Sequence, residues 1–221
     1  MNKGEFYSRD INYKSWGYDN YYGLQDIQKY NDERYVLDRE LILNKTFYNK
    51  IFKQQGNFVN YIITYSPHTP FTTEKEVGKI LAEEKYGKGN VPKLSEEDCA
   101  KMAASETDNM VGLLIQALKD NGLYDNTVIV AYADHYLYTL DDKSILDKYK
   151  ETSNNLINHT PFFIWSSDLG QLTSISKVNM QMDILPTVLN LFGIDYNSNN
   201  YIGHDILSND FKGYAFFSDY S

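Results

Sequence analysis

The stretch Gly122-Leu-Tyr-Asp-Asn-Thr-Val-Ile-Val-Ala-Tyr-Ala-Asp-His-Tyr136 decides the fold and locates the chemistry. Residues 127–133 form an apolar, β-branched run that follows a Tyr-Asp-Asn turn, which predicts a strand buried on both faces. The strand ends at Asp134 and His135. An open α/β sheet holds its ligand at the carboxyl ends of its strands, so we expect a site at this dipeptide.

The Asp134-His135 pair is a candidate metal site. A carboxylate oxygen and a neutral imidazole nitrogen are ordinary ligands of Zn²⁺ and Mn²⁺. The same residue types also cap helices and close turns, so the dipeptide alone leaves both interpretations open.

Composition limits the class of protein. The 221 residues are 42% hydrophobic and 23% charged, which predicts one globular domain over residues 1–221 with a sizeable core. The net charge of −9 argues against nucleic acid as a partner. No stretch approaches the ~20 apolar residues of a membrane span, and no signal peptide is visible, so we expect this chain itself to be soluble. The single cysteine, Cys99, excludes an intrachain disulfide and a cysteine-based zinc site.

Hydrophobic periodicity alternates between the helical and the strand pattern, which predicts an α/β sheet flanked by helices. Residues 1–32 show little periodicity and predict irregular surface structure, and a short helix is expected within 72–93. The predicted helices are 38–54, 95–121, 141–150 and 183–192, and the predicted strands are 57–64, 127–133, 162–165 and 214–217.

A histidine follows a second predicted strand. His68 comes just after residues 57–64, between Pro67 and Pro70, which disfavour a helix there. It is a candidate substrate contact, and the alternative is a turn histidine held by Ser66 or Thr69.

Several motifs together resemble the sulfatase-like half of lipoteichoic acid synthases, phosphoglycerol transferases of the alkaline phosphatase superfamily. Besides residues 122–136, the likeness covers five further motifs in the order of that family. They are Phe6-Tyr-Ser-Arg-Asp10, Ser66-Pro-His-Thr-Pro-Phe71, His159-Thr-Pro-Phe-Phe-Ile-Trp165, Met182-Asp-Ile-Leu-Pro-Thr-Val-Leu-Asn-Leu-Phe-Gly-Ile-Asp195 and Tyr201-Ile-Gly-His-Asp-Ile-Leu-Ser208.

The resemblance implies a mechanism and a fold. In that family a metal-bound threonine attacks the phosphate of phosphatidylglycerol, and glycerol phosphate then passes to a growing polymer, with Mn²⁺ (or Mg²⁺ or Zn²⁺) as the cofactor. The implied fold is an alkaline-phosphatase/sulfatase-like sheet flanked by helices. The implied place of work is the extracellular face of the plasma membrane, in a longer parent.

The resemblance also assigns residues. Asp134 and His135 match two metal ligands, His68 matches a histidine that contacts the phosphoglycerol group, and Arg9 matches a phosphate-binding arginine. Tyr7 stands where the family has a tryptophan beside that arginine. His159 is a further candidate for substrate binding, with a packed, hydrogen-bonded histidine as the alternative. Arg9 could equally form a surface ion pair.

The departures from the family matter for activity. The family's threonine nucleophile and a glutamate ligand lie upstream of the Arg9 motif and have no counterpart here, so we expect a partial domain without its amino-terminal part and without activity of its own. Ala133 and Leu137 replace two glycines of the family. With its leading strands missing, the sheet is expected to have an exposed edge or an uncovered face, which predicts self-association. A sulfatase or another phosphotransferase on the same scaffold, and a noncatalytic binding module, remain the alternatives.

Overall fold

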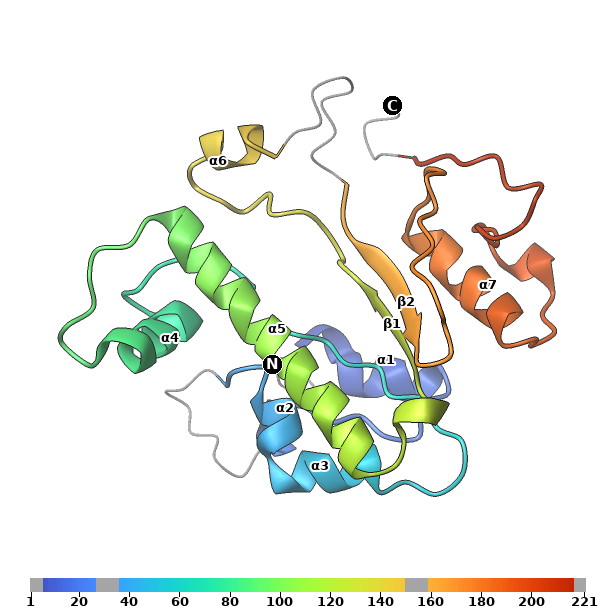
Figure 1. The fold of residues 1–221 in the computed structure, drawn as a ribbon, viewed down its shortest axis with the longest axis horizontal. Coiled ribbons are helices and arrows are strands. Elements are labelled where there is room, and N and C mark those ends of the chain that lie inside the picture. The colour runs from blue at the N-terminus through green and yellow to red at the C-terminus, as the bar shows by residue number, and fades with distance from the viewer. Residues whose placement is uncertain (1–5, 27–35, 150–158, 217–221) are drawn as a thin grey trace. The chain divides into compact units, whose positions relative to one another are not determined.

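A computed structural model describes residues 6–26, 36–149 and 159–216 (Figure 1). The chain divides into two compact units, residues 1–168 and 169–221, which are treated separately below. The first unit contains η1 (Phe6–Ser8), α1 (Arg9–Ser15), η2 (Leu24–Asp26), α2 (Glu40–Leu43), α3 (Lys45–Phe52), α4 (Glu76–Tyr86), α5 (Glu96–Asp120), η3 (Tyr124–Asn126), β1 (Val128–Tyr132), α6 (Ser144–Asp147) and β2 (Phe162–Ser166). The second contains α7 (Gln181–Leu191) and η4 (Ser198–Asn200).

The first unit is built on α5, which runs diagonally through Figure 1. Ser95 begins it as predicted, because its Oγ accepts the backbone N–H of Asp98 at 3.1 Å and so caps one of the open N–H groups of the first turn. Three acidic side chains in that turn suit the positive end of the helix dipole. At the other end Gly122 has a φ of 65°, which favours glycine after a helix.

The main core lies where α2 and α3 pack on the second half of α5. The helix predicted over 38–54 is divided in two, because the Asn44 side chain accepts the Thr46 N–H at 3.0 Å and begins a new helix. The buried residues of this core are Leu41, Ile42, Phe52, Met110, Ala117 and Leu118.

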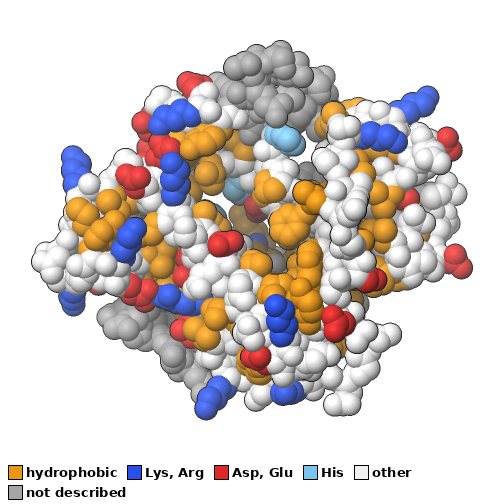
Figure 2. All heavy atoms as spheres, viewed as in Figure 1, with side chains coloured by type: hydrophobic (Ala, Val, Ile, Leu, Met, Phe, Trp, Pro, Cys, Tyr) orange, Lys and Arg blue, Asp and Glu red, His pale blue; other side chains and the backbone are white. Residues whose placement is uncertain are grey.

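β1 and β2 form an antiparallel pair in which Val128 lies opposite Ser166 and Tyr132 opposite Phe162. The prediction of a strand buried on both faces is wrong, since no residue of either strand is buried. Ile129 packs against the main core, but Val128 and Tyr132 on the opposite face stay 37% and 39% exposed. Figure 2 shows the resulting hydrophobic side chains near the strands, on a surface where both charge signs are otherwise mixed.

Three other predicted elements differ from the structure. Residues 57–64 form no strand. Ile62 packs against the main core, and the Tyr61 hydroxyl lies 3.0 Å from the Tyr132 hydroxyl. Residues 214–216 form no strand either, and Phe217 lies outside the described residues. The helix predicted over 141–150 is limited to α6, and α1 forms where irregular structure was predicted.

The second unit is organised around α7 and the turn that follows η4. Asp183, which is fully buried, accepts the backbone N–H groups of Met180 at 3.0 Å and His204 at 2.8 Å. The turn lies so close to the helix that a Cβ on Gly203 would stand 1.9 Å from the Met182 carbonyl oxygen. Of the helices in the described ranges, none combines the length and the apolar character that crossing a membrane requires.

Candidate active site

Asp134 and His135 lie immediately beyond β1. The Asp134 Oδ1 atom is 3.6 Å from His135 Nε2, and the two side chains are 86% and 40% exposed. The Nδ1 atom of His135 is 2.8 Å from the Tyr136 carbonyl oxygen. A carbonyl only accepts, so Nδ1 is the donor of this contact, and Nε2 is the ring nitrogen that faces the carboxylate.

This pair suits a divalent metal ion in donor type but supplies only part of a coordination sphere. A carboxylate oxygen and an imidazole nitrogen oriented by a backbone carbonyl are ligands that Mn²⁺ and Zn²⁺ accept. Within residues 6–26, 36–149 and 159–216, no group of three or more His, Cys, Asp or Glu side chains could hold a metal.

His68 lies in a turn with the same local arrangement. Its backbone N–H donates to the Tyr65 carbonyl at 2.9 Å, and its ring stacks on the Tyr65 ring with 5.3 Å between centroids. Its Nδ1 is 2.7 Å from the Thr69 carbonyl oxygen, so Nε2 is again the atom available to accept a hydrogen bond.

Arg9 opens α1, and Tyr7 just before it is 77% exposed. The phenols of Tyr13 and Tyr21 interact electrostatically with the Arg9 guanidinium. Burial raises the pKa of each phenol, and the guanidinium acts in the opposite direction. The positive charge of Arg9 therefore lies near the hydroxyls of these two tyrosines.

Tyrosines connect this helix to the end of β1. The Tyr13 ring stacks on Tyr61 with 5.8 Å between centroids, and the Tyr61 and Tyr132 hydroxyls are 3.0 Å apart. Burial and the hydrogen bond with Tyr132 raise the pKa of Tyr61. Tyr132 precedes Asp134 by two residues, so the tyrosines link the Arg9 helix to the strand that ends in the candidate metal pair. The sequence signal for them was the count of 20 tyrosines, from which no role followed.

His159 is exposed and lies ahead of β2. The Ala133 N–H donates to the Pro161 carbonyl at 3.3 Å, which extends the β1–β2 pairing one step past Tyr132. His159 stands two residues before Pro161 and therefore near the end of the ladder that carries Asp134 and His135.

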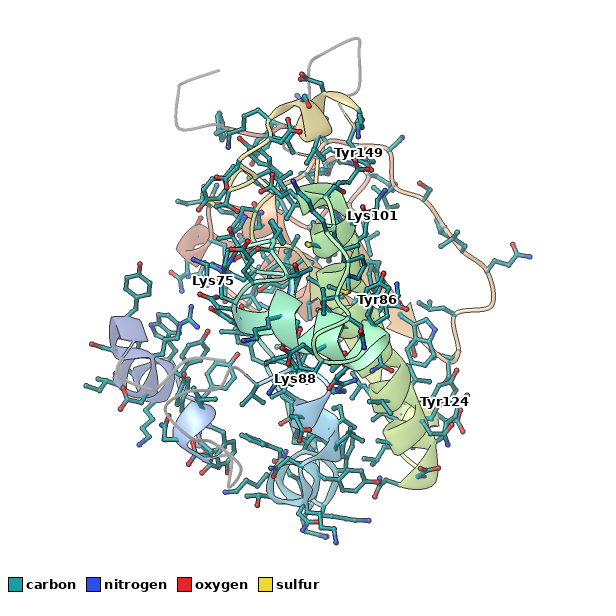
Figure 3. All side chains as sticks on the ribbon, turned by 90° about the vertical axis from the view of Figure 1, so that its left-hand side faces the viewer. Lys75, Tyr86, Lys88, Lys101, Tyr124 and Tyr149 are labelled. Atoms are coloured by element: carbon teal, nitrogen blue, oxygen red, sulfur yellow. The ribbon has the colours of Figure 1, made fainter. Side chains whose placement is uncertain are left out.

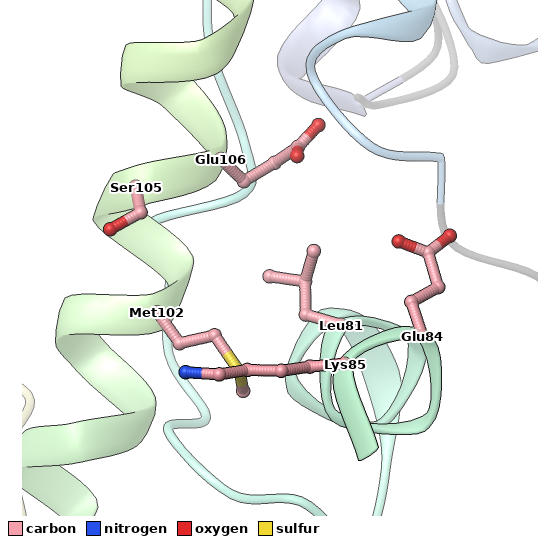
Figure 4. A pocket seen from close by; sticks show the side chains of 6 residues that line it. All are labelled: Leu81, Glu84, Lys85, Met102, Ser105 and Glu106. Atoms are coloured by element: carbon pink, nitrogen blue, oxygen red, sulfur yellow. The ribbon is translucent and has the colours of Figure 1, made fainter. Parts of the chain in front are cut away.

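The structure thus places Asp134 in contact with His135, and tyrosine contacts connect the Arg9 helix to β1. The contacts of His68 are with Tyr65 and Thr69 instead. A hollow shared by all these side chains stays a prediction. A shallow pocket elsewhere, between α4 and α5, contains none of them (Figure 4). Its lining residues are Leu81, Glu84, Lys85, Met102, Ser105 and Glu106.

The known proteins to which this chain is similar include several that are named lipoteichoic acid synthase. Lipoteichoic acid synthase of Staphylococcus saprophyticus is 31% identical over 214 residues, which cover 93% of this chain and 31% of that protein. Lipoteichoic acid synthase of Staphylococcus aureus (strain USA300) is 30% identical over 211 residues, which cover 92% of this chain and 31% of that protein. This chain therefore spans less than a third of the length of these curated relatives.

A solved structure supports the fold. The crystal structure of the lipoteichoic acid synthase LtaP from Listeria monocytogenes matches with a TM-score of 0.69 and 27% identity, over 94% of this chain and 52% of that one. The predicted fold class, a partial alkaline-phosphatase/sulfatase-like fold, is thereby confirmed. The family described as Sulfatase matches residues 1–194, and this chain belongs to that family.

Proposed function

We propose that residues 1–221 form part of a metal-dependent phosphoglycerol transferase domain of the sulfatase family. In the longer parent, the domain would transfer phosphoglycerol groups from a phosphatidylglycerol-like lipid to a cell-envelope polymer at the extracellular face of the plasma membrane. The observation that carries the proposal is the Asp134-His135 pair, with Nε2 of the imidazole held beside a carboxylate oxygen at the end of a strand. The relatives named lipoteichoic acid synthase favour phosphoglycerol transfer over sulfate ester hydrolysis.

Each candidate residue has a role that suits its chemistry. Asp134 and His135 would hold Mn²⁺, Mg²⁺ or Zn²⁺ together with ligands from elsewhere in the parent. A bound metal ion supplies Lewis acidity toward a phosphoryl oxygen. The other candidates would bind the donor substrate.

Arg9 would donate two parallel hydrogen bonds to the phosphate through its guanidinium fork. The His68 Nε2 atom would accept a hydrogen bond from a glycerol hydroxyl. The exposed Tyr7 ring would cover the substrate beside Arg9, and His159 would approach it from the other strand.

Metal binding by this chain tests the proposal. Calorimetric titration with MnCl₂ should give a Kd above about 1 μM, because two protein ligands rarely hold a divalent ion without help. Asp134→Asn and His135→Gln should each weaken binding by about 10-fold. His204→Gln, in the second unit, is the matched control and should leave it unchanged. Equal affinity in all four proteins would remove Asp134 and His135 from the metal site.

We also propose that this chain has no phosphodiesterase turnover of its own, because it lacks a counterpart of the family's threonine nucleophile. Release of glycerol phosphate from phosphatidylglycerol by the purified chain with Mn²⁺ is the assay. Turnover that disappears in Asp134→Ala would contradict the proposal. Self-association through the half-exposed strand faces is expected as well, and a monomer at high concentration in light scattering would argue against it.

A further inference from the structure

Asp38 is a buried carboxylate with no role in the site described so far. It precedes α2 and is 3% exposed. A buried ionised carboxylate is costly unless donors satisfy its oxygens, so its partners show what it does in the fold.

Two backbone donors of Asp38 come from the turn that carries His68. Oδ1 accepts the Tyr65 N–H at 2.7 Å, and the Ser66 N–H lies 3.1 Å from both carboxylate oxygens. In return the Asp38 N–H donates to Ser66 Oγ at 3.0 Å. A further donor, Thr107 Oγ1 on α5, lies 2.7 Å from Oδ2 and fixes the carboxylate to the central helix. The turn is thus fastened to α5 through Asp38.

The fastened residues set the position of His68. Tyr65, whose N–H is held by Asp38, accepts the His68 N–H through its carbonyl and stacks on the imidazole, with the two rings only 9° from parallel. Ser66 is fully buried, so the turn has little freedom to shift. The bond from His68 Nδ1 to the Thr69 carbonyl forms within this fixed turn.

We infer that Asp38 is a positioning residue for His68: its carboxylate holds the 65–66 backbone so that the imidazole keeps the proton on Nδ1 and presents Nε2 as an acceptor. The inference rests on the proposed function only for the substrate contact that Nε2 makes. The tautomer itself can be measured without any substrate.

Long-range ¹H–¹⁵N NMR of the labelled chain, at a pH where imidazoles are neutral, reports the tautomer of each of the four histidines. His68→Gln assigns the His68 signal. The wild-type chain should show a single Nδ1–H tautomer at His68, and Asp38→Ala should convert it to an averaged mixture. Asp38→Asn should retain the single tautomer, because its amide oxygen still accepts from the turn and its NH₂ group can donate to Thr107.

Glu106→Gln is the matched control. Glu106 on α5 is 4% exposed and lies beside Asp38, but it accepts from the Arg39 N–H at 3.1 Å rather than from the turn. Its substitution should leave the His68 signal in place. If Asp38→Ala does not fold, Ser66→Ala removes the reciprocal hydrogen bond alone and should broaden or shift the same signal.

An unchanged tautomer in folded Asp38→Ala would overturn the inference, as would an unchanged His68 signal in Ser66→Ala or an equal change in Glu106→Gln. Titration with glycerol 1-phosphate separates this inference from the proposed function. If the ligand causes no shift at His68 in the wild-type chain while Asp38→Ala changes the tautomer, the substrate role fails and the positioning role stands.

Discussion

The His68 turn and the His135 turn share a local arrangement and differ in what surrounds it. Both imidazoles donate from Nδ1 to the carbonyl of the next residue, at 2.7 Å and 2.8 Å. The His68 turn contains the fully buried Ser66 and is bonded to a carboxylate 28 residues away in the chain. The His135 turn is open, with Asp134 86% exposed at its side.

The two turns therefore differ in how firmly the rest of the chain holds them. The His68 turn is preorganised by buried hydrogen bonds, which are strong because water does not compete for them. Two exposed side chains next to each other gain little from pairing in water. The exposed Asp134-His135 pair is therefore held in place less firmly than the His68 turn.

The largest expected effect comes from removing the buried anchor. Asp38→Ala should lower the free energy of unfolding by about 3 kcal/mol, because it removes the acceptor of the buried Ser66 N–H and of the half-buried Tyr65 N–H. Asp134→Ala should change it by less than about 0.5 kcal/mol, as an exposed side chain does. Urea denaturation followed by circular dichroism measures both. An equal loss of unfolding free energy in Asp38→Ala and Asp134→Ala would mean that the rest of the chain holds the two turns equally firmly.

A second pair of substitutions tests the segment that follows His68. A Cβ on Gly78 in α4 would stand 2.1 Å from the Thr72 carbonyl oxygen, so Gly78→Ala should push this segment away and cost about 2 kcal/mol. Gly112→Ala, also within a helix but with nothing within 4 Å of the new Cβ, should stabilise the chain by about 0.5 kcal/mol.

Thermal unfolding of the two alanine variants gives the comparison directly, since both make the same chemical change in a helix. A gain in stability from Gly78→Ala would show that the 69–72 segment yields easily, and that the His68 turn is less firmly held than its hydrogen bonds indicate.

Elements with local signals could be predicted from the sequence. The cap at Ser95 and the glycine at 122 place α5 within one residue of its observed ends, and the β-branched run locates β1. Residues 57–64 carry the same kind of run, but a strand also needs a hydrogen-bonded neighbour, which a local pattern does not reveal. Whether β1 is buried likewise depends on which residues cover its outer face, and a local pattern does not reveal those residues either.

The residues of the candidate site and those that support it also differ in whether a local sequence pattern predicts their contacts. Asp134 and His135 are neighbours in the chain, so the sequence alone places them together. Asp38 gives no periodic signal, and its partners Ser66 and Thr107 lie 28 and 69 residues further along the chain. Only the folded structure brings these three residues into contact.

The smallest expected effect concerns the segment after His135, which is bonded to α5 by two half-buried carboxylates. Glu96 accepts the backbone N–H groups of Asp141 and Asp142 at 2.8 Å and 2.9 Å. Glu97 pairs with Lys101 and Lys148 and accepts the Tyr149 hydroxyl, and Figure 3 shows Lys101 and Tyr149 together at this end of the helix.

Hydrogen bonds from Lys101, then from Lys148 and Tyr149, lower the pKa of Glu97 from 4.5 to about 2. A carboxyl group whose pKa is lower in the folded state than in the unfolded state stabilises the fold above the unfolded value. That stabilisation is lost as the pH falls from 4.5 toward 2. Glu97→Gln should therefore lower the Tm slightly at neutral pH and reduce the further fall in Tm on acidification.

Scanning calorimetry at pH values above and below this window, with exposed Glu74→Gln as the control, measures the difference. Because the lysines that pair with Glu97 are exposed, added salt should shrink the effect at neutral pH. An acid-induced fall in Tm of the same size in Glu97→Gln and in the wild-type chain would show that these ion pairs do not hold the segment. The segment after His135 would then be held to α5 mainly by the two backbone hydrogen bonds that Glu96 accepts.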